Sequence, residues 1–286
     1  MSEPGPNAGQ VTYWNEDAGP RWVRWEAAFD RQIAPIGEAA MAVLAPRPGE
    51  RVLDLGCGFG VTTVALGKRV GPTGRVLGVD VSAPMLARAR ARAAALGHVA
   101  FLEADAQTHA FPPGHTDAVF SRFGVMFFTD PVAAFANVRR AATPHGRLAF
   151  CCWQGVGRNP WRSVPLAAVA GVAPLPPPPA PDAPGPFAFA DATRVRTILE
   201  AAGWAHVDVV AHETEVWVGP GADLDETVEF VIDVAGPAAS LQQSGALDAP
   251  MRRRVADAVR DALMPFHVDG GVRMPAAAWI VTARAA

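Results

Sequence analysis

The sequence predicts an α/β protein built on a doubly wound, mainly parallel sheet. Short apolar runs typical of buried strands alternate with helix-like segments, and five such runs lie between residues 51 and 153. A glycine-rich turn follows the first run, and an acidic residue ends the second. Right-handed crossover helices would cover both faces of such a sheet, and ligands bind at the carboxyl ends of its strands.

The composition excludes several other classes of protein. Of the 286 residues, 50% are hydrophobic and 19% are charged, which is typical of a folded chain of one or two domains. The net charge of -3 gives no basic excess for nucleic acid. Three cysteines without a C-x-x-C pair predict neither a disulfide framework nor a metal site.

The N-terminal segment and the longest uncharged run predict the cellular location of the protein. The first ten residues lack the basic and apolar regions of a secretory signal, and prolines interrupt the longest uncharged run. We therefore expect a cytoplasmic protein without a membrane span. Lys68 is the only lysine among 25 basic residues, which indicates a GC-rich, bacterial genome.

The first half of the chain divides into an arm and a core. Residues 1–12 are expected to be loose, and residues 13–44 to be helical with a break near Pro35. The whole of 1–44 is interpreted as a helical arm or lid, and 45–155 as a nucleotide-binding core. The expected strands are 51–55, 75–79, 99–102, 117–121 and 148–153; the expected helices are 61–69, 84–96 and 131–142.

The second half begins with an insertion and then completes the sheet. Eight of the thirteen residues from 174 to 186 are proline, so 156–190 is interpreted as an extended insertion or lid over the sheet edge. Residues 191–286 are expected to form a helix from Asp191 to about 202, strands 207–218 and 277–283, and helices 224–235 and 251–264. The apolar face of the last helix suits either the core or a homodimer.

The glycine turn predicts a nucleotide-like ligand. Gly56, Gly58 and Gly60 let the backbone turn sharply and approach a ligand closely, and Asp80 follows the last glycine by 20 residues, where an acid binds ribose hydroxyls. The spacing is G-x-G-x-G rather than the dinucleotide pattern G-x-G-x-x-G. Asp54, two residues before the first glycine, would repel a pyrophosphate but attract an ammonium or sulfonium group.

These segments together resemble a known family. D-L-G-C-G-F-G at 54–60, G-V-D at 78–80, E-A-D-A at 103–106 and P-H-G-R-L at 144–148 are similar to motifs of the class I S-adenosylmethionine (SAM) dependent methyltransferases. The likeness covers about residues 45–155 and is nearest to the small-molecule branch of ubiquinone and menaquinone biosynthesis. His145 departs from the family's P-G-G-x-L turn.

The resemblance implies a fold, a cofactor and a reaction. The fold is a Rossmann-like sheet of seven strands in the order 3-2-1-4-5-7-6 with the last strand antiparallel. The reaction is O-, N- or C-methylation of a small, partly apolar acceptor by in-line attack on the methyl group of SAM, which leaves S-adenosylhomocysteine. The implied cofactor-binding residues are Asp54, Gly56, Cys57, Gly58, Asp80, Val81, Met85, Asp105, Ala106, Ser121 and Trp14. Among them Met85 would pack on the adenine, and Asp105 would accept from its amino group.

The sequence leaves alternatives open for the acceptor pocket and for the function. Candidate pocket residues are Tyr13, Arg122, Trp153, Phe187 and Phe189. Arg122 would bind an acidic acceptor or pair with a local acid such as Asp130 or Asp105, and no catalytic residue is assigned. Among the histidines only His267 is a candidate base. The alternatives to a methyltransferase are an NAD(P)-dependent oxidoreductase and a SAM-binding protein that does not methylate.

Overall fold

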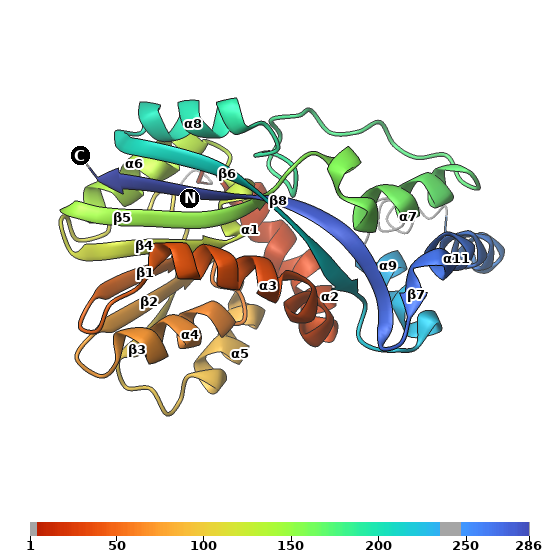
Figure 1. Cartoon of the computed structure of the whole chain (residues 1–286), viewed down its shortest axis with the longest axis horizontal. Coiled ribbons are helices and arrows are strands. Elements are labelled where there is room, and N and C mark those ends of the chain that lie inside the picture. Colours follow the sequence, from red (N-terminus) through yellow and green to blue (C-terminus); the bar gives the residue numbers. More distant parts are fainter. Residues whose placement is uncertain (1–4, 235–246, 286) are drawn as a thin grey trace.

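A computed structural model describes residues 5–234 and 247–285 and contains one mixed sheet (Figure 1). Its strand order is β3-β2-β1-β4-β5-β8-β6, and a two-residue β7 pairs with β8 outside this path. The strands are β1 (Arg51–Leu55), β2 (Arg75–Asp80), β3 (Val99–Glu103), β4 (Thr116–Arg122), β5 (Ala142–Trp153), β6 (Trp204–Val218), β7 (His267–Val268) and β8 (Gly271–Ala285). The first five are parallel, and β8 is antiparallel to both β5 and β6, so the predicted order is confirmed with β7 as an addition.

Helices cover both faces of the sheet. In Figure 1, α3, α4 and α5 lie on the near face, and α6 and α8, which contact one another, lie on the other. Their bounds are α3 (Glu26–Leu44), α4 (Val61–Val70), α5 (Ala83–Arg92), α6 (Pro131–Ala141) and α8 (Ala192–Ala201). Asp191 caps α8 by accepting from the backbone N–H groups of Thr193 and Arg194, which fixes where that helix begins.

The structure corrects the expected break at Pro35. Helix α3 runs through this position without interruption, with Pro35 on its exposed side. Ile36, Ala40 and Leu44 lie on the opposite face and are buried in the core. Packing of that face against the sheet outweighs the loss of one backbone hydrogen bond at an exposed position.

The strands β6 and β8 form a long antiparallel pair that extends beyond the rest of the sheet (Figure 1). Three helices pack around the extension: α7 (Pro160–Ala170), α9 (Leu224–Val234) and α11 (Ala249–Leu263). Val255, Val259 and Leu263 of α11 are fully buried there, so this face belongs to a second hydrophobic core and not to a dimer interface.

Helix α7 lies inside the predicted proline-rich insertion and was not expected. Pro160 occupies its first turn, where a missing backbone N–H costs nothing, and a second proline, Pro165, lies within it. The following proline-rich stretch returns toward the sheet, where the Gly185 N–H donates to the carbonyl oxygen of Met126. Within the described ranges, no helix combines the length and apolar character needed to cross a bilayer.

Candidate functional site

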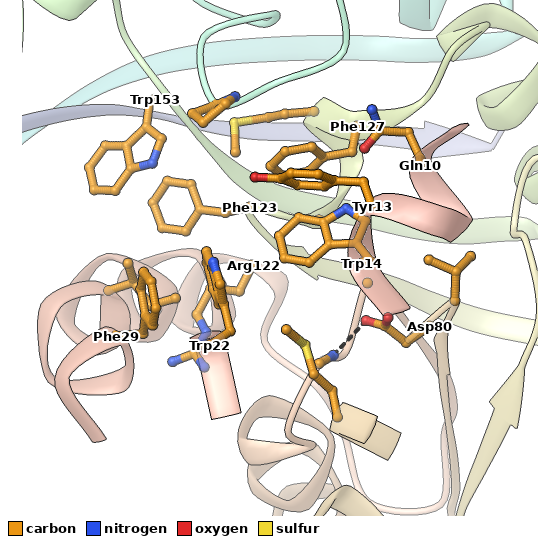
Figure 2. Close-up of a pocket in the computed structure, with 18 of the residues that line it drawn as sticks. Gln10, Tyr13, Trp14, Trp22, Phe29, Asp80, Arg122, Phe123, Phe127 and Trp153 are labelled. Atoms are coloured by element: carbon orange, nitrogen blue, oxygen red, sulfur yellow. Dashed lines mark hydrogen bonds between the residues drawn. The ribbon is translucent and has the colours of Figure 1, made fainter. Parts of the chain in front are cut away.

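A cavity of about 330 Å³ lies at the carboxyl ends of β1 to β4, between the two hydrophobic cores. The N-terminal segment covers it: α1 (Ala8–Thr12), the π-helical turn η1 (Tyr13–Asp17) and α2 (Ala18–Arg24). Figure 2 shows an acidic end marked by Asp80 and an aromatic end formed by Trp22, Phe29, Phe123 and Trp153. We call these the cofactor end and the acceptor end.

The glycine loop forms the floor of the cofactor end. Gly56 has a φ of +62°, and a Cβ atom on it would lie 2.7 Å from the Cα of Gly124, so only glycine fits between β1 and the chain that follows β4. Gly58 has a φ of +50° and lines the cavity. The close packing of Gly56 on Gly124 thus fixes the position of the loop backbone at Gly58, which lines the cavity.

Asp80, the last residue of β2, holds this loop in place. Its Oδ2 accepts the backbone N–H of Gly58 at 2.7 Å (Figure 2). Its Oδ1 accepts the backbone N–H of Ser82 at 2.9 Å. Burial raises the pKa of Asp80, while these backbone hydrogen bonds oppose the rise. The carboxylate lines the cavity, and each oxygen keeps a lone pair with which it can accept from a ligand.

Asp54 lies beneath the loop, outside the cavity lining, and is completely buried. Its Oδ2 accepts from the hydroxyl groups of Thr62 and Thr63 at 2.8 and 2.7 Å, whereas no described residue donates to its Oδ1. Burial raises the pKa of Asp54 to about 6. Burying a carboxylate oxygen without a hydrogen-bond donor costs free energy, and a cationic ligand group nearby would reduce that cost.

Side chains of the N-terminal segment tie it to the residues of the cofactor end. Asn7 Nδ2 donates to Asp105 Oδ1 at 2.9 Å. Asn15 Nδ2 donates to the Val81 carbonyl at 2.8 Å, and Asn15 Oδ1 accepts the Ala83 N–H at 3.0 Å. The arm predicted from the sequence therefore lies directly over the loops that follow β2 and β3.

Trp14 covers the cofactor end of the cavity on the side of the N-terminal segment. Its ring makes edge-to-face contacts with Phe127 and Trp22, at centroid distances of 5.0 and 5.2 Å. Gly19 lets the backbone of α2 approach Trp14, since a Cβ there would lie 2.2 Å from the Trp14 carbonyl oxygen. Tyr13 follows the same wall, and its hydroxyl points toward the acceptor end (Figure 2).

Stacked aromatic rings form the walls of the acceptor end. Trp22 stacks on Phe29 at 3.6 Å and Phe123 on Trp153 at 4.2 Å, and Trp161 of α7 packs on Trp153 at 4.8 Å. Phe123 has a φ of +63°, a left-handed conformation that is strained for an aromatic residue. This turn directs the Phe123 ring into the cavity immediately after β4.

Two arginines reach the cavity and differ in their partners. Arg122 forms an ion pair with Asp30 of α3 at 2.8 Å, an acid that was not among its predicted partners. Arg162 of α7 also lines the cavity, but its guanidinium has no hydrogen bond or ion pair within the described parts of the chain. Burial lowers the pKa of Arg162, and the nearby Tyr13 side chain opposes that shift.

The structure brings most of the predicted site residues together around one cavity. The lining contains Trp14, Gly56, Gly58, Asp80, Val81, Met85, Asp105 and Ala106 from the predicted cofactor set, and Tyr13, Arg122 and Trp153 from the predicted acceptor set. Asp105 Oδ1 already accepts from Asn7 and from the Gln107 N–H, whereas its Oδ2 accepts only a long hydrogen bond of 3.4 Å from the Thr108 hydroxyl within the described residues.

Five predicted residues lie outside the lining. Besides Asp54, Cys57 is buried under the loop, where burial raises the pKa of its thiol well above the usual range. Ser121 donates to the Leu55 carbonyl and accepts from the Gly124 N–H, so it positions the loops instead of facing a ligand. Phe189 is a core residue, and Phe187 stacks on Trp161 from outside the cavity.

Several lining residues were missed by the sequence analysis. Trp22 and Phe29 were assigned only to the helix pattern, because their spacing also suits core packing. Gln10 lay in a segment expected to be loose, yet its Oε1 is buried without a donor beside the cofactor end. Arg162 lay in the segment interpreted as a proline-rich insertion. No sequence signal distinguished these residues from structural ones.

The described lining contains neither histidine nor cysteine, lysine or glutamate. The candidate base His267 is exposed, and its Nε2 lies 2.8 Å from the carbonyl oxygen of Ala222, away from the cavity. Within the described ranges, no three histidine, cysteine or acidic side chains form a group that could hold a metal ion.

Comparison with known proteins agrees with this geometry. Residues 52–146 match a family described as a methyltransferase domain. The chain is 35% identical over 143 residues to aklanonic acid methyltransferase DauC of Streptomyces sp. strain C5, which covers 49% of this chain and 64% of that protein. It is 44% identical over 100 residues to the demethylmenaquinone methyltransferase of Thermus thermophilus, which covers 35% of this chain and 45% of that protein.

The fold has a counterpart among solved structures. Phosphoethanolamine N-methyltransferase 2 of Haemonchus contortus, in complex with S-adenosyl-L-methionine, superposes with a TM-score of 0.53 at 16% identity over 99% of this chain and 58% of that one. The predicted resemblance to a methyltransferase is thereby confirmed for residues 52–146, while the chain spans only part of the curated relatives it matches.

Proposed function

We propose that this chain, which contains a methyltransferase domain at residues 52–146, transfers a methyl group from SAM to a small, partly apolar acceptor. The observation that carries the proposal is the contact of Asp80 with Gly58 at the mouth of an aromatic cavity. An acid at the end of the second strand beside a glycine turn binds ribose hydroxyls, and the aromatic end has room for an acceptor.

The residues at the cofactor end fit SAM. Asp80 has free lone pairs facing the cavity, and Met85 offers an apolar surface to a base. Asp105 Oδ2, whose hydrogen bond from Thr108 is long at 3.4 Å, has capacity to accept from an amino group. Asp54, buried beneath the glycine loop, adds a further carboxylate behind this end of the cavity. These carboxylates place negative charge at the cofactor end, which favours a cationic ligand over a pyrophosphate.

SAM supplies an activated methyl group when it is bound. What remains for the protein is to hold an acceptor against it and to keep water out. Trp14 covers the cofactor end, and the Trp22–Phe29 and Phe123–Trp153 stacks shield the acceptor end. We infer that catalysis here depends on positioning and on an apolar environment.

The names of the relatives agree with an acceptor of this kind, since one acts on aklanonic acid and another on a demethylmenaquinone. The structural relative in complex with S-adenosyl-L-methionine agrees with the proposed cofactor. The cytoplasmic location, a homodimer and the lack of a nucleic-acid partner stay predictions from the sequence.

A product assay tests this function. The purified protein is incubated with SAM and a panel of quinols, phenols and aromatic acids, and S-adenosylhomocysteine and methylated products are followed by mass spectrometry. We expect both products to accumulate together with at least one acceptor, and the Asp80→Ala variant to be strongly impaired. Binding of SAM without turnover on any acceptor would instead favour a SAM-binding protein, and binding of NADH alone would favour an oxidoreductase.

A further inference from the structure

We propose that Arg162 anchors an anionic group of the acceptor, so that the molecule methylated here is a flat, mainly apolar acid. The acid would carry a carboxylate or an ionised hydroxyl group. This inference rests on the proposed methyl transfer and adds the chemical class of the acceptor and the residue that selects it.

In the part of the chain that the structure describes, the guanidinium of Arg162 has no counter-charge. Arg162 is half-buried and lines the cavity, yet no acidic side chain pairs with it within residues 5–234 and 247–285. The other arginine of the cavity, Arg122, is neutralised by Asp30 at 2.8 Å. A cation held in an apolar cavity without a partner is unfavourable, and a ligand anion would remove that cost.

Arg162 comes from α7, the helix that contributes Trp161 to the acceptor end of the cavity. Its neighbour Trp161 packs on Trp153 at 4.8 Å, and Trp153 stacks on Phe123. The carboxylates that line the cavity lie at the cofactor end, where Figure 2 shows Asp80 and where Asp105 follows the carboxyl end of β3. The electrostatics of the cavity therefore direct a cationic ligand group to one end and an anionic group to the other.

The walls of the acceptor end indicate the shape of the acid. The stacked pairs Trp22–Phe29 and Phe123–Trp153 present extended flat surfaces, with Val218 and Phe230 from the second core completing an apolar lining. Such surfaces favour a planar ring system over a flexible polar chain.

The chemistry of the lining agrees with an acidic acceptor. No side chain of the described acceptor end has the usual pKa of a general base near neutrality. An acceptor that is ionised at neutral pH needs no proton removed by the protein before it binds. Arg162 would then act as a positioning and specificity residue.

Matched ligands test the inference through binding. The probes are 2-naphthoate and 2-naphthamide, which share one ring system and differ in charge. Their dissociation constants are measured by calorimetry for the wild type, Arg162→Gln, Arg162→Lys and the control Arg158→Gln. Arg158 is an exposed arginine shortly before α7 that pairs with Glu213 on the surface. The dissociation constant of SAM is measured for every variant in parallel.

We expect the wild type and Arg158→Gln to bind 2-naphthoate at least tenfold more tightly than 2-naphthamide. Arg162→Gln should bind both probes equally, and Arg162→Lys should recover part of the preference. Absence of the preference in the wild type, including failure to bind 2-naphthoate, or its persistence in Arg162→Gln would overturn the inference. A weaker affinity of Arg162→Gln for SAM would also overturn it, because Arg162 would then bind the cofactor's own carboxylate. If SAM fails to bind any variant while the naphthoate preference holds, the proposed function fails and the anion site stands.

Discussion

Asp80 is the residue on which the cofactor assignment depends most. It joins the glycine loop to the cavity and faces the ligand space with its free lone pairs. We expect Asp80→Ala to weaken SAM binding by about 1–3 kcal/mol, the usual range for hydrogen bonds to a charged group. Calorimetric titration measures the change. Glu103→Ala is the matched control, because Glu103 pairs in register with Asp80 at the same sheet edge but is exposed. Equal effects of the two substitutions would contradict the ribose assignment.

Asp54 predicts a dependence of stability on pH. Its folded-state pKa of about 6 lies above the ordinary value of 3.8, so the folded chain holds this proton more tightly than the unfolded chain does. The stabilisation is complete below about pH 4 and is lost as pH rises through 6. A shift of about two pKa units corresponds to roughly 3 kcal/mol.

The Asp54→Asn variant isolates this effect because it cannot titrate. We expect the ligand-free variant to gain stability relative to the wild type, by roughly 2–3 kcal/mol, between pH 4 and pH 7.5. Urea unfolding at a series of pH values measures the difference. A difference that stays constant with pH would show that Asp54 is ionised in the folded chain throughout this range.

At the scale of elements, the N-terminal segment is a cover held by a few polar contacts. Asn15 alone supplies two hydrogen bonds that join η1 to Val81 and Ala83. We expect Asn15→Ala to raise amide exchange in residues 8–17 and to weaken SAM binding by about 1–3 kcal/mol for the two hydrogen bonds.

The exposed neighbour Glu16 provides the control for this experiment. Glu16→Ala should leave the exchange of residues 8–17 and the affinity for SAM close to the wild-type values. Faster exchange in Asn15→Ala with unaltered SAM affinity would mean that the N-terminal segment covers the cavity without contributing to cofactor binding.

The elements also show what the sequence can predict. The strands β1 to β4 and the glycine turn were predicted closely, because their apolar runs and turn residues are local signals. Helix α7 was missed because its prolines, Pro160 and Pro165, indicate a break, while tertiary packing on β8 and α11 holds the helix together. The helix after β2 ends at Arg92, earlier than the expected Leu96.

The same distinction applies to the site. Residues whose role depends on the loop motif, such as Gly58 and Asp80, were predicted, whereas residues brought in by long-range packing were not. Phe189 illustrates the limit: its aromatic character suits a pocket equally well, but contacts with Phe135 and Phe150 place it in the core. Only the folded structure shows whether such an aromatic residue lines a pocket or packs in the core.

At the scale of the whole molecule, the cavity lies where two hydrophobic cores meet. The sheet provides the cofactor end, and the second core around the long β6–β8 pair provides part of the acceptor end through Val218, Phe230 and Val231. In the proposed reaction, this arrangement would separate cofactor binding from acceptor recognition. Substitutions in the second core are therefore expected to alter acceptor selection more than SAM affinity.

Binding of SAM is expected to stabilise the whole folded chain. A ligand that binds only the folded chain adds about 2.7 kcal/mol of stability at 100 times its dissociation constant. For a chain of this size we expect a rise in melting temperature of roughly 5–10 °C. NADH at the same concentration should leave the melting temperature unchanged, and comparison of the two ligands requires protein free of bound S-adenosylhomocysteine.

Direct titration with SAM tests the central claim. Ligand-free protein, checked by mass spectrometry for residual S-adenosylhomocysteine, is titrated by calorimetry with SAM and, separately, with NADH. We expect a single site per chain with micromolar affinity for SAM, loss of most of that affinity in Asp80→Ala, and no heat of binding with NADH. Folded protein that binds NADH and not SAM would contradict the account and would assign the glycine loop to a dinucleotide.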